Sequence, residues 1–261
     1  MKLRFALIAL LCVLPVAELK ATGTISDQLT VYTEENPPFS YVENGEAKGL
    51  YVDLILELFS QLGIQKKRSD IIVAPWSRAF KETKLRKNSM LFSMVRSPER
   101  ESSFKWVGPI GEYRPVLYAR RDRALDLKES KGLSQYRYGL TKNSQVEKFL
   151  LKAGATQENF LYFHSPKSAA EMLARGRIDA WARDFSVAHW TLQDLGYDIK
   201  EYQVVHTFEV QSRYIALNKE TDEAFIRRFQ EKLDALDANG MLAAITKSKS
   251  MAQAASNSAN R

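Results

Sequence analysis

The sequence is poor in cysteine and histidine, and this scarcity excludes several kinds of chemistry. It contains one cysteine, Cys12, and three histidines in 261 residues. A disulfide framework and a cysteine-based zinc site are therefore excluded. His164, His189 and His206 lie far apart and lack the short spacing of metal ligands. No nucleophile elbow, phosphate-binding loop or metal motif occurs. We predict no metal, no cofactor and no catalytic residue.

Long apolar runs are also missing. The longest, residues 5–16, follows a basic start, Met1-Lys2-Leu3-Arg4. About a dozen apolar residues are too few to cross a bilayer, which takes about 20, but they suit a secretory signal peptide. We predict a signal peptide over residues 1–21, with cleavage after Ala21 or, nearly as well placed, after Ala17. Cleavage removes Cys12 and leaves a soluble periplasmic protein.

Acidic residues are outnumbered, and the formal net charge is +7. Basic clusters occur at 66–68, 81–87 and 120–123, in separate segments with no interleaved aromatic pattern. We therefore expect no nucleic-acid partner, but a solvated basic surface that attracts anionic ligands.

Strand-like and helix-like patterns alternate along the chain. Apolar residues at helical spacing predict a helix over 50–62, ended by Gly63, after a strand at 29–33. An Asn44-Gly45 pair between them is typical of a hairpin turn. The alternation occurs once up to about Gly111 and again from about Arg137. This pattern predicts an α/β fold with two lobes.

Hydroxyl side chains mark the starts of several predicted helices. Ser77 and Ser165 are expected N-caps, Ser144 opens a capping box with Glu147, and Thr221 caps the last amphipathic helix. In open α/β sheets, helix N-termini gather at the carboxyl ends of the strands, where anions bind.

One stretch, residues 93–110, combines features that suit a small anion. Ser93 lies in an apolar strand, Ser97-Pro98 turns the chain, and Arg100 follows the turn. A guanidinium can hold a carboxylate through two parallel hydrogen bonds, whereas a lysine cannot. On these residues alone Arg100 is a candidate for binding a small anion, and a solvated loop arginine is the alternative.

Four motifs occur in an order that resembles a known family. They are Pro37-Pro38-Phe39, Gly49-Leu-Tyr-Val-Asp-Leu-Ile55, Ser97-Pro-Glu-Arg100 followed by Phe104 and Pro109, and Gly176-Arg-Ile-Asp-Ala180 followed by Asp184. Over residues 25–248 the chain is similar to the extracytoplasmic solute-binding proteins of family 3, the polar amino-acid receptors of ABC importers. The resemblance implies a two-lobed periplasmic binding protein fold of type II. Each lobe is a mixed sheet flanked by helices, and two strands form the hinge. Lobe 1 would comprise 25–113 plus 213–249, lobe 2 would comprise 114–212, and 250–261 would be a disordered tail.

The resemblance also implies a site. Arg100 would hold the ligand α-carboxylate with help from the Ser93 hydroxyl, and Asp184 would receive the α-ammonium from the opposite lobe. Ser144 and Gln145 would present a helix N-terminus to the same carboxylate. Trp76 and Arg78 would line the cleft.

The chain departs from the family pattern at three positions. Tyr51 stands where an acid is usual, Asn36 where an aromatic is frequent, and Val95 where a second hydroxyl is expected. We therefore place ligand specificity around Asn36, Tyr51, Trp76 and Arg78.

The resemblance implies a monomeric periplasmic receptor. It would bind an amino acid or similar small carboxylated solute and deliver it to a membrane ABC permease. Two alternatives remain open: a soluble sensor that docks on a membrane receptor, and an enzyme on the same fold, similar to cyclohexadienyl dehydratase.

Overall fold

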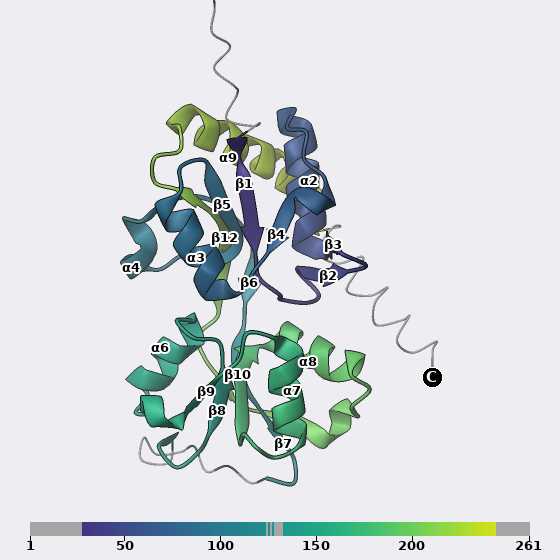
Figure 1. Ribbon diagram of the computed structural model, residues 1–261, viewed down its shortest axis with the longest axis vertical. Helices are drawn as coiled ribbons and strands as arrows, with labels where there is room; N and C mark the ends of the chain where they lie inside the picture. The colour runs from purple at the N-terminus through teal and green to yellow at the C-terminus, as the bar shows by residue number, and fades with distance from the viewer. Residues whose placement is uncertain (1–27, 124, 126, 128–132, 244–261) are drawn as a thin grey trace, which may run out of the picture.

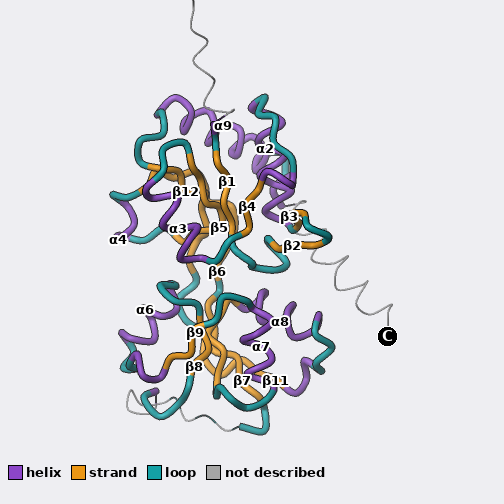
Figure 2. Tube along the Cα trace, viewed as in Figure 1, coloured by secondary structure: helices purple, strands orange, loops and turns teal. Residues whose placement is uncertain are grey.

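The structure of the protein is a computed structural model that describes residues 28–123, 125, 127 and 133–243. The predicted signal peptide and the predicted tail at 250–261 lie outside the described residues. The fold is α/β, with two five-stranded sheets flanked by helices, as predicted (Figures 1 and 2). No helix in the described ranges combines the length and apolar character that a membrane crossing demands.

The first sheet has the strand order β4-β1-β5-β12-β6. Its strands are β1 (Thr30–Thr33), β4 (Ile71–Val73), β5 (Ser89–Val95), β6 (Phe104–Tyr113) and β12 (Gln211–Asn218). β1 runs parallel to β4 and β5, whereas β12 runs antiparallel to β5 and β6. The sheet is therefore mixed. Its strand β12, between β5 and β6, comes from the C-terminal part of the chain.

Helices cover both faces of this sheet because each has an apolar stripe at helical spacing. α2 (Leu50–Leu62) and α9 (Glu223–Ala238) pack together, with the Phe59 and Phe229 ring centroids 6.1 Å apart. α2 has the predicted bounds and ends at Gly63, whose φ of 73° is the left-handed cap expected there. α3 (Trp76–Leu85) joins a separate apolar cluster with Leu91 and Phe104.

The second sheet has the order β11-β7-β10-β8-β9. Its strands are β7 (Pro115–Arg120), β8 (Tyr138–Leu140), β9 (Phe160–Tyr162), β10 (Ala180–Asp184) and β11 (Tyr202–Thr207). α6 (Gln145–Lys152) packs on one apolar cluster of this sheet. α7 (Pro166–Ala174) and α8 (Phe185–Asp194) pack on another.

Two connections join the sheets, one from β6 to β7 and one from β11 to β12 (Figure 1). We call the first sheet with its helices lobe 1 and the second sheet with its helices lobe 2. The residue boundaries expected for the lobes stay a prediction. Lobe 1 also carries the hairpin of β2 (Tyr41–Glu43) and β3 (Glu46–Lys48), and the short helix α4 (Pro98–Glu101). The hairpin turns at Asn44 and Gly45, whose positive φ values agree with the predicted turn.

Three predicted helix caps differ in detail. α3 begins at Trp76 after Pro75, so Ser77 lies inside the helix instead of capping it. Asp222 caps α9 in place of Thr221, and its carboxylate accepts the Phe225 N–H at 3.0 Å. Ser165 occupies the N-cap position of α7, but its side chain makes no capping hydrogen bond. At α9, the carboxylate of Asp222 caps the helix one residue later than predicted. At α3 and α7, the difference lies in the backbone geometry of the first turn, which local sequence does not specify.

Candidate functional site

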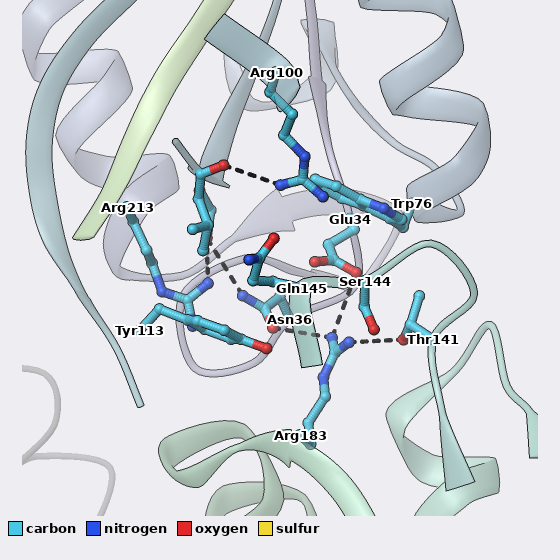
Figure 3. A pocket seen from close by; sticks show the side chains of 12 residues that line it. Glu34, Asn36, Trp76, Arg100, Tyr113, Thr141, Ser144, Gln145, Arg183 and Arg213 are labelled. Atoms are coloured by element: carbon cyan, nitrogen blue, oxygen red, sulfur yellow. Dashed lines mark hydrogen bonds and ion pairs between the residues drawn. The ribbon is translucent and has the colours of Figure 1, made fainter. Parts of the chain in front are cut away.

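A small cleft lies between the two lobes and collects charged side chains from both (Figure 3). Its open volume is about 40 Å³. Its lining residues are Glu34, Asn36, Trp76, Ser93, Val95, Arg100, Tyr113, Thr141, Ser144, Gln145, Arg183 and Arg213. Arg100, Arg183 and Arg213 approach it from three sides (Figure 3). The cleft is therefore a strongly basic site.

Arg100 reaches this cleft from the short helix α4. Its side chain lies over the Trp76 ring, and its Nη1 donates to the Val95 carbonyl at 3.0 Å. Its Nη2 donates to the Asn143 carbonyl of lobe 2 at 3.4 Å. Among the described residues no carboxylate lies within ion-pairing distance of Arg100, although it is only 5% exposed. Burial lowers the pKa of its guanidinium.

Ser93 holds a backbone conformation that non-glycine residues rarely adopt. Its φ is 69°, in the middle of strand β5, next to an irregularity in the pairing with β12. This conformation places the hydroxyl in the cleft, where Oγ accepts hydrogen bonds from Arg213 Nη1 at 2.8 Å and from Asn36 Nδ2 at 3.4 Å. Such local strain is characteristic of functional positions.

Arg213 and Asp184 form a buried ion pair between the lobes. Arg213 Nη2 lies 2.9 Å from Asp184 Oδ2, although its N–H groups are not aligned for a hydrogen bond. Arg213 Nε donates to the Glu112 carbonyl at 3.0 Å. Burial lowers the pKa of Arg213, but the Asp184 carboxylate, the Tyr51 and Tyr113 phenols and the Glu34 carboxylate outweigh this effect and leave the pKa raised. Arg213 is therefore a fixed positive charge.

Arg183 connects lobe 2 to the loop after β1. Its Nη1 donates to Thr141 Oγ1 at 2.8 Å within lobe 2. Its Nη2 donates to Asn36 Oδ1 at 3.0 Å and to the Glu35 carbonyl at 3.2 Å, and lies 3.4 Å from Glu34 Oε2. This contact closes one side of the cleft.

The start of helix α6 faces the cleft from lobe 2. Ser144 Oγ accepts the Glu147 N–H at 3.3 Å, which is one half of the predicted capping box. In the other half, the Glu147 carboxylate accepts the N–H of Asn143 and not that of Ser144. The Gln145 Oε1 atom is buried and has no hydrogen-bond partner among the described residues. A helix N-terminus and an unpartnered acceptor are therefore both available to a ligand.

Six of the nine residues predicted from the sequence line the cleft. They are Asn36, Trp76, Ser93, Arg100, Ser144 and Gln145. Tyr51 and Asp184 instead line a second, more open pocket beside the hinge, and burial raises the pKa of Tyr51 to about 12. Arg78 is exposed on α3 and lines neither pocket. Ligand contact by any of the nine stays a prediction.

Sequence reasoning missed Arg183, Arg213 and Tyr113 as cleft residues. Arg183 is the next-to-last residue of β10, after three apolar residues, and Arg213 is the third residue of β12, before the apolar residues 214–217. A buried charge at a strand end is the signal that was present. Tyr113 carries no such signal, because an aromatic residue at the end of a strand usually belongs to the core.

Solved structures with the same fold include an arginine-binding protein mutant from T. maritima. That structure has a TM-score of 0.73 and 20% identity, and the match covers 86% of this chain and 96% of the other. The arginine-, lysine-, histidine-binding protein ArtJ from Geobacillus stearothermophilus has a TM-score of 0.72 and 18% identity, with coverage of 84% and 94%. A histidine kinase sensor domain described as similar to periplasmic binding proteins has a TM-score of 0.73 and 19% identity, also with coverage of 84% and 94%. At these identities the likeness shows the fold.

No curated protein matches the chain. The model of the bacterial extracellular solute-binding proteins, family 3, matches residues 29–248. This match spans both sheets and every cleft residue described above. The chain therefore belongs to the bacterial extracellular solute-binding proteins, family 3.

Proposed function

We propose that this protein is a periplasmic receptor that captures a small carboxylated solute between its lobes and delivers it to an ABC permease. The observation that carries the proposal is Arg100, a buried guanidinium in the cleft without a described acidic partner. A buried charge without a counter-ion is costly, and a ligand carboxylate would supply that counter-ion.

The surroundings of Arg100 suit a carboxylate. Trp76 supports the guanidinium plane, and the N-terminus of α6 supplies positive electrostatic potential from the opposite lobe. A carboxylate between them would contact both lobes at once. Binding would then favour the closed form, because only that form provides both sets of contacts.

A thermal-shift screen of small carboxylates and amino acids tests the capture step. Ligand at about 100 times its Kd adds about 2.7 kcal/mol to the free energy of unfolding. For a chain of this size that increase corresponds to a rise in Tm of about 5–10 °C. We expect Arg100→Gln to abolish the shift, and Arg86→Gln, at an exposed arginine directly after α3, to preserve it. A screen in which no carboxylate raises Tm overturns the proposal.

Delivery requires a separate experiment. In cells lacking this protein, uptake of the labelled ligand should fall and should recover with wild-type protein but not with Arg100→Gln. Unchanged uptake together with a lost transcriptional response would instead assign a sensory role. Incubation with prephenate or arogenate should yield no product, and turnover would assign an enzyme.

A further inference from the structure

We infer that the solute is a small carboxylate without an ammonium group, of the 2-hydroxy acid class, and not an amino acid. This inference rests on the proposed function and concerns the chemistry of the same cleft. The observation behind it is that Arg213 already forms an ion pair with Asp184, the acid to which the family resemblance assigns a ligand ammonium group.

Asp184 is already surrounded by backbone N–H groups and by Arg213, which leaves little room for a ligand ammonium group. Its Oδ1 accepts the backbone N–H groups of Ser186 at 2.9 Å and Val187 at 3.4 Å, as the N-cap of α8. Its Oδ2 accepts the Arg114 N–H at 2.9 Å and lies 2.9 Å from Arg213 Nη2. A carboxylate offers about four acceptor directions; three accept backbone N–H groups here, and the Arg213 guanidinium lies against the remaining side as an ion-pair partner. Asp184 is also only 2% exposed.

Arg213 cannot readily swing away to release Asp184. The Arg213 guanidinium carbon lies 4.8 Å from the Phe39 ring centroid and 4.9 Å from that of Tyr113. Its Nη1 and Nε are hydrogen-bonded to Ser93 Oγ and the Glu112 carbonyl. Displacement would break these contacts together and leave a buried charge uncompensated.

The other charges around the cleft also disfavour an ammonium group. Three arginines line it against a single carboxylate, Glu34, and that carboxylate already faces Arg183. A ligand cation would therefore meet like charges at short range. The unpartnered Gln145 Oε1 is a neutral acceptor and suits a ligand hydroxyl.

The size of the cleft favours a ligand with few heavy atoms. Its open volume of about 40 Å³ is roughly three times the minimum that one water molecule requires. Short 2-hydroxy acids are among the smallest solutes that offer both a carboxylate for Arg100 and an O–H donor for Gln145 Oε1.

The test compares matched pairs on the wild-type protein by thermal shift and isothermal titration calorimetry. The pairs are lactate with L-alanine and glycolate with glycine. We expect at least one acid to bind ten times more tightly or better than its amino-acid partner. Amino acids that bind as tightly as the acids would overturn this inference and leave the proposed function standing. No binding by any carboxylate would overturn both.

A substitution gives an independent readout. Arg213→Met frees Asp184, so we expect the ratio of acid to amino-acid affinity to fall at least tenfold. Adding Asp184→Asn to that variant should remove the gain in amino-acid binding. An unchanged ratio in folded Arg213→Met would overturn the inference. If this variant does not fold, the matched pairs on the wild-type protein decide.

Discussion

Arg183 Nη2 donates a hydrogen bond to Asn36 Oδ1 over 3.0 Å and thereby ties strand β10 of lobe 2 to the loop after β1 in lobe 1. The same guanidinium also donates to Thr141 in lobe 2, so a single side chain makes hydrogen bonds to both lobes. The lobes are therefore joined by the side chain of Arg183 as well as by the two hinge connections.

Replacing this arginine should open the ligand-free protein. Arg183→Met removes the hydrogen bonds to Asn36 and Glu35 while keeping most of the side-chain volume. We expect a larger radius of gyration by small-angle X-ray scattering. Arg175→Met, at an exposed site after α7, is the control and should leave the radius unchanged. Equal radii for wild type and Arg183→Met would contradict the role of this contact in holding the lobes together.

Trp76 should slow the release of ligand. Its Nε1 donates to the Asn143 carbonyl at 3.2 Å, across the lobe interface. Trp76→Phe removes this bond of about 1 kcal/mol, so the dissociation rate should rise roughly fivefold. Trp106→Phe is the matched control, because the Trp106 Nε1 has no partner among the described residues. Dissociation rates from competition experiments distinguish the two, and identical rates would contradict the prediction.

Backbone strain at Ser93 predicts an unusual order of stability. Ser93→Ala and Ser93→Gly both lose the hydroxyl, but only glycine relieves the φ of 69°. The relief of strain is partly offset by the entropic cost of glycine. The free energy of unfolding of Ser93→Gly should therefore be higher than that of Ser93→Ala by roughly 0.5–1 kcal/mol.

The helical position Ser77 supplies the opposite expectation. Ser77→Ala should be more stable than Ser77→Gly by about 1 kcal/mol, since it lies inside α3. Urea unfolding measures both pairs. The same order at the two positions would refute strain at Ser93.

Glu35 should make stability depend on pH. Burial raises the pKa of its carboxyl above the ordinary value of 4.5, and the positive charge of Lys167 opposes this only in part. The folded protein then binds the proton more tightly than the unfolded chain does. The favourable contribution is thus fully present below pH 4.5 and is lost as the pH rises through the raised pKa.

Glu35→Gln should therefore have a higher Tm than wild type at pH 7. This difference should disappear below pH 4.5, where wild-type Glu35 is protonated in both states. Glu209→Gln, at an exposed site, should show little difference at either pH. A lower Tm for Glu35→Gln at pH 7 would contradict the sign.

Local signals predicted much of the fold. The α2 helix and its Gly63 cap followed from apolar spacing and from the preference of glycine for positive φ. Asp184 is the N-cap of α8, a position that aspartate favours. Its pairing with Arg213 could not be predicted, because it depends on how β10 and β12, in different sheets, meet at the hinge.

The contrast between Trp76 and Arg78 has a similar origin. Both belong to α3, but two residues along a helix turn the side chain through about 200°. Trp76 therefore lines the cleft whereas Arg78 is exposed. Uncertainty about where α3 begins was enough to hide this difference from sequence reasoning.

The position of Arg213 in the chain links recognition to mechanics. It belongs to β12, and its neighbours there, Gln211 and Ser212, pair with the last residues of β6 at the crossing between the lobes. A substitution at this position would alter the charge of the cleft and also the surroundings of the β12–β6 pairing where the lobes join. A sequence change at position 213 would thus act on the cleft and on the connection between the lobes at the same time.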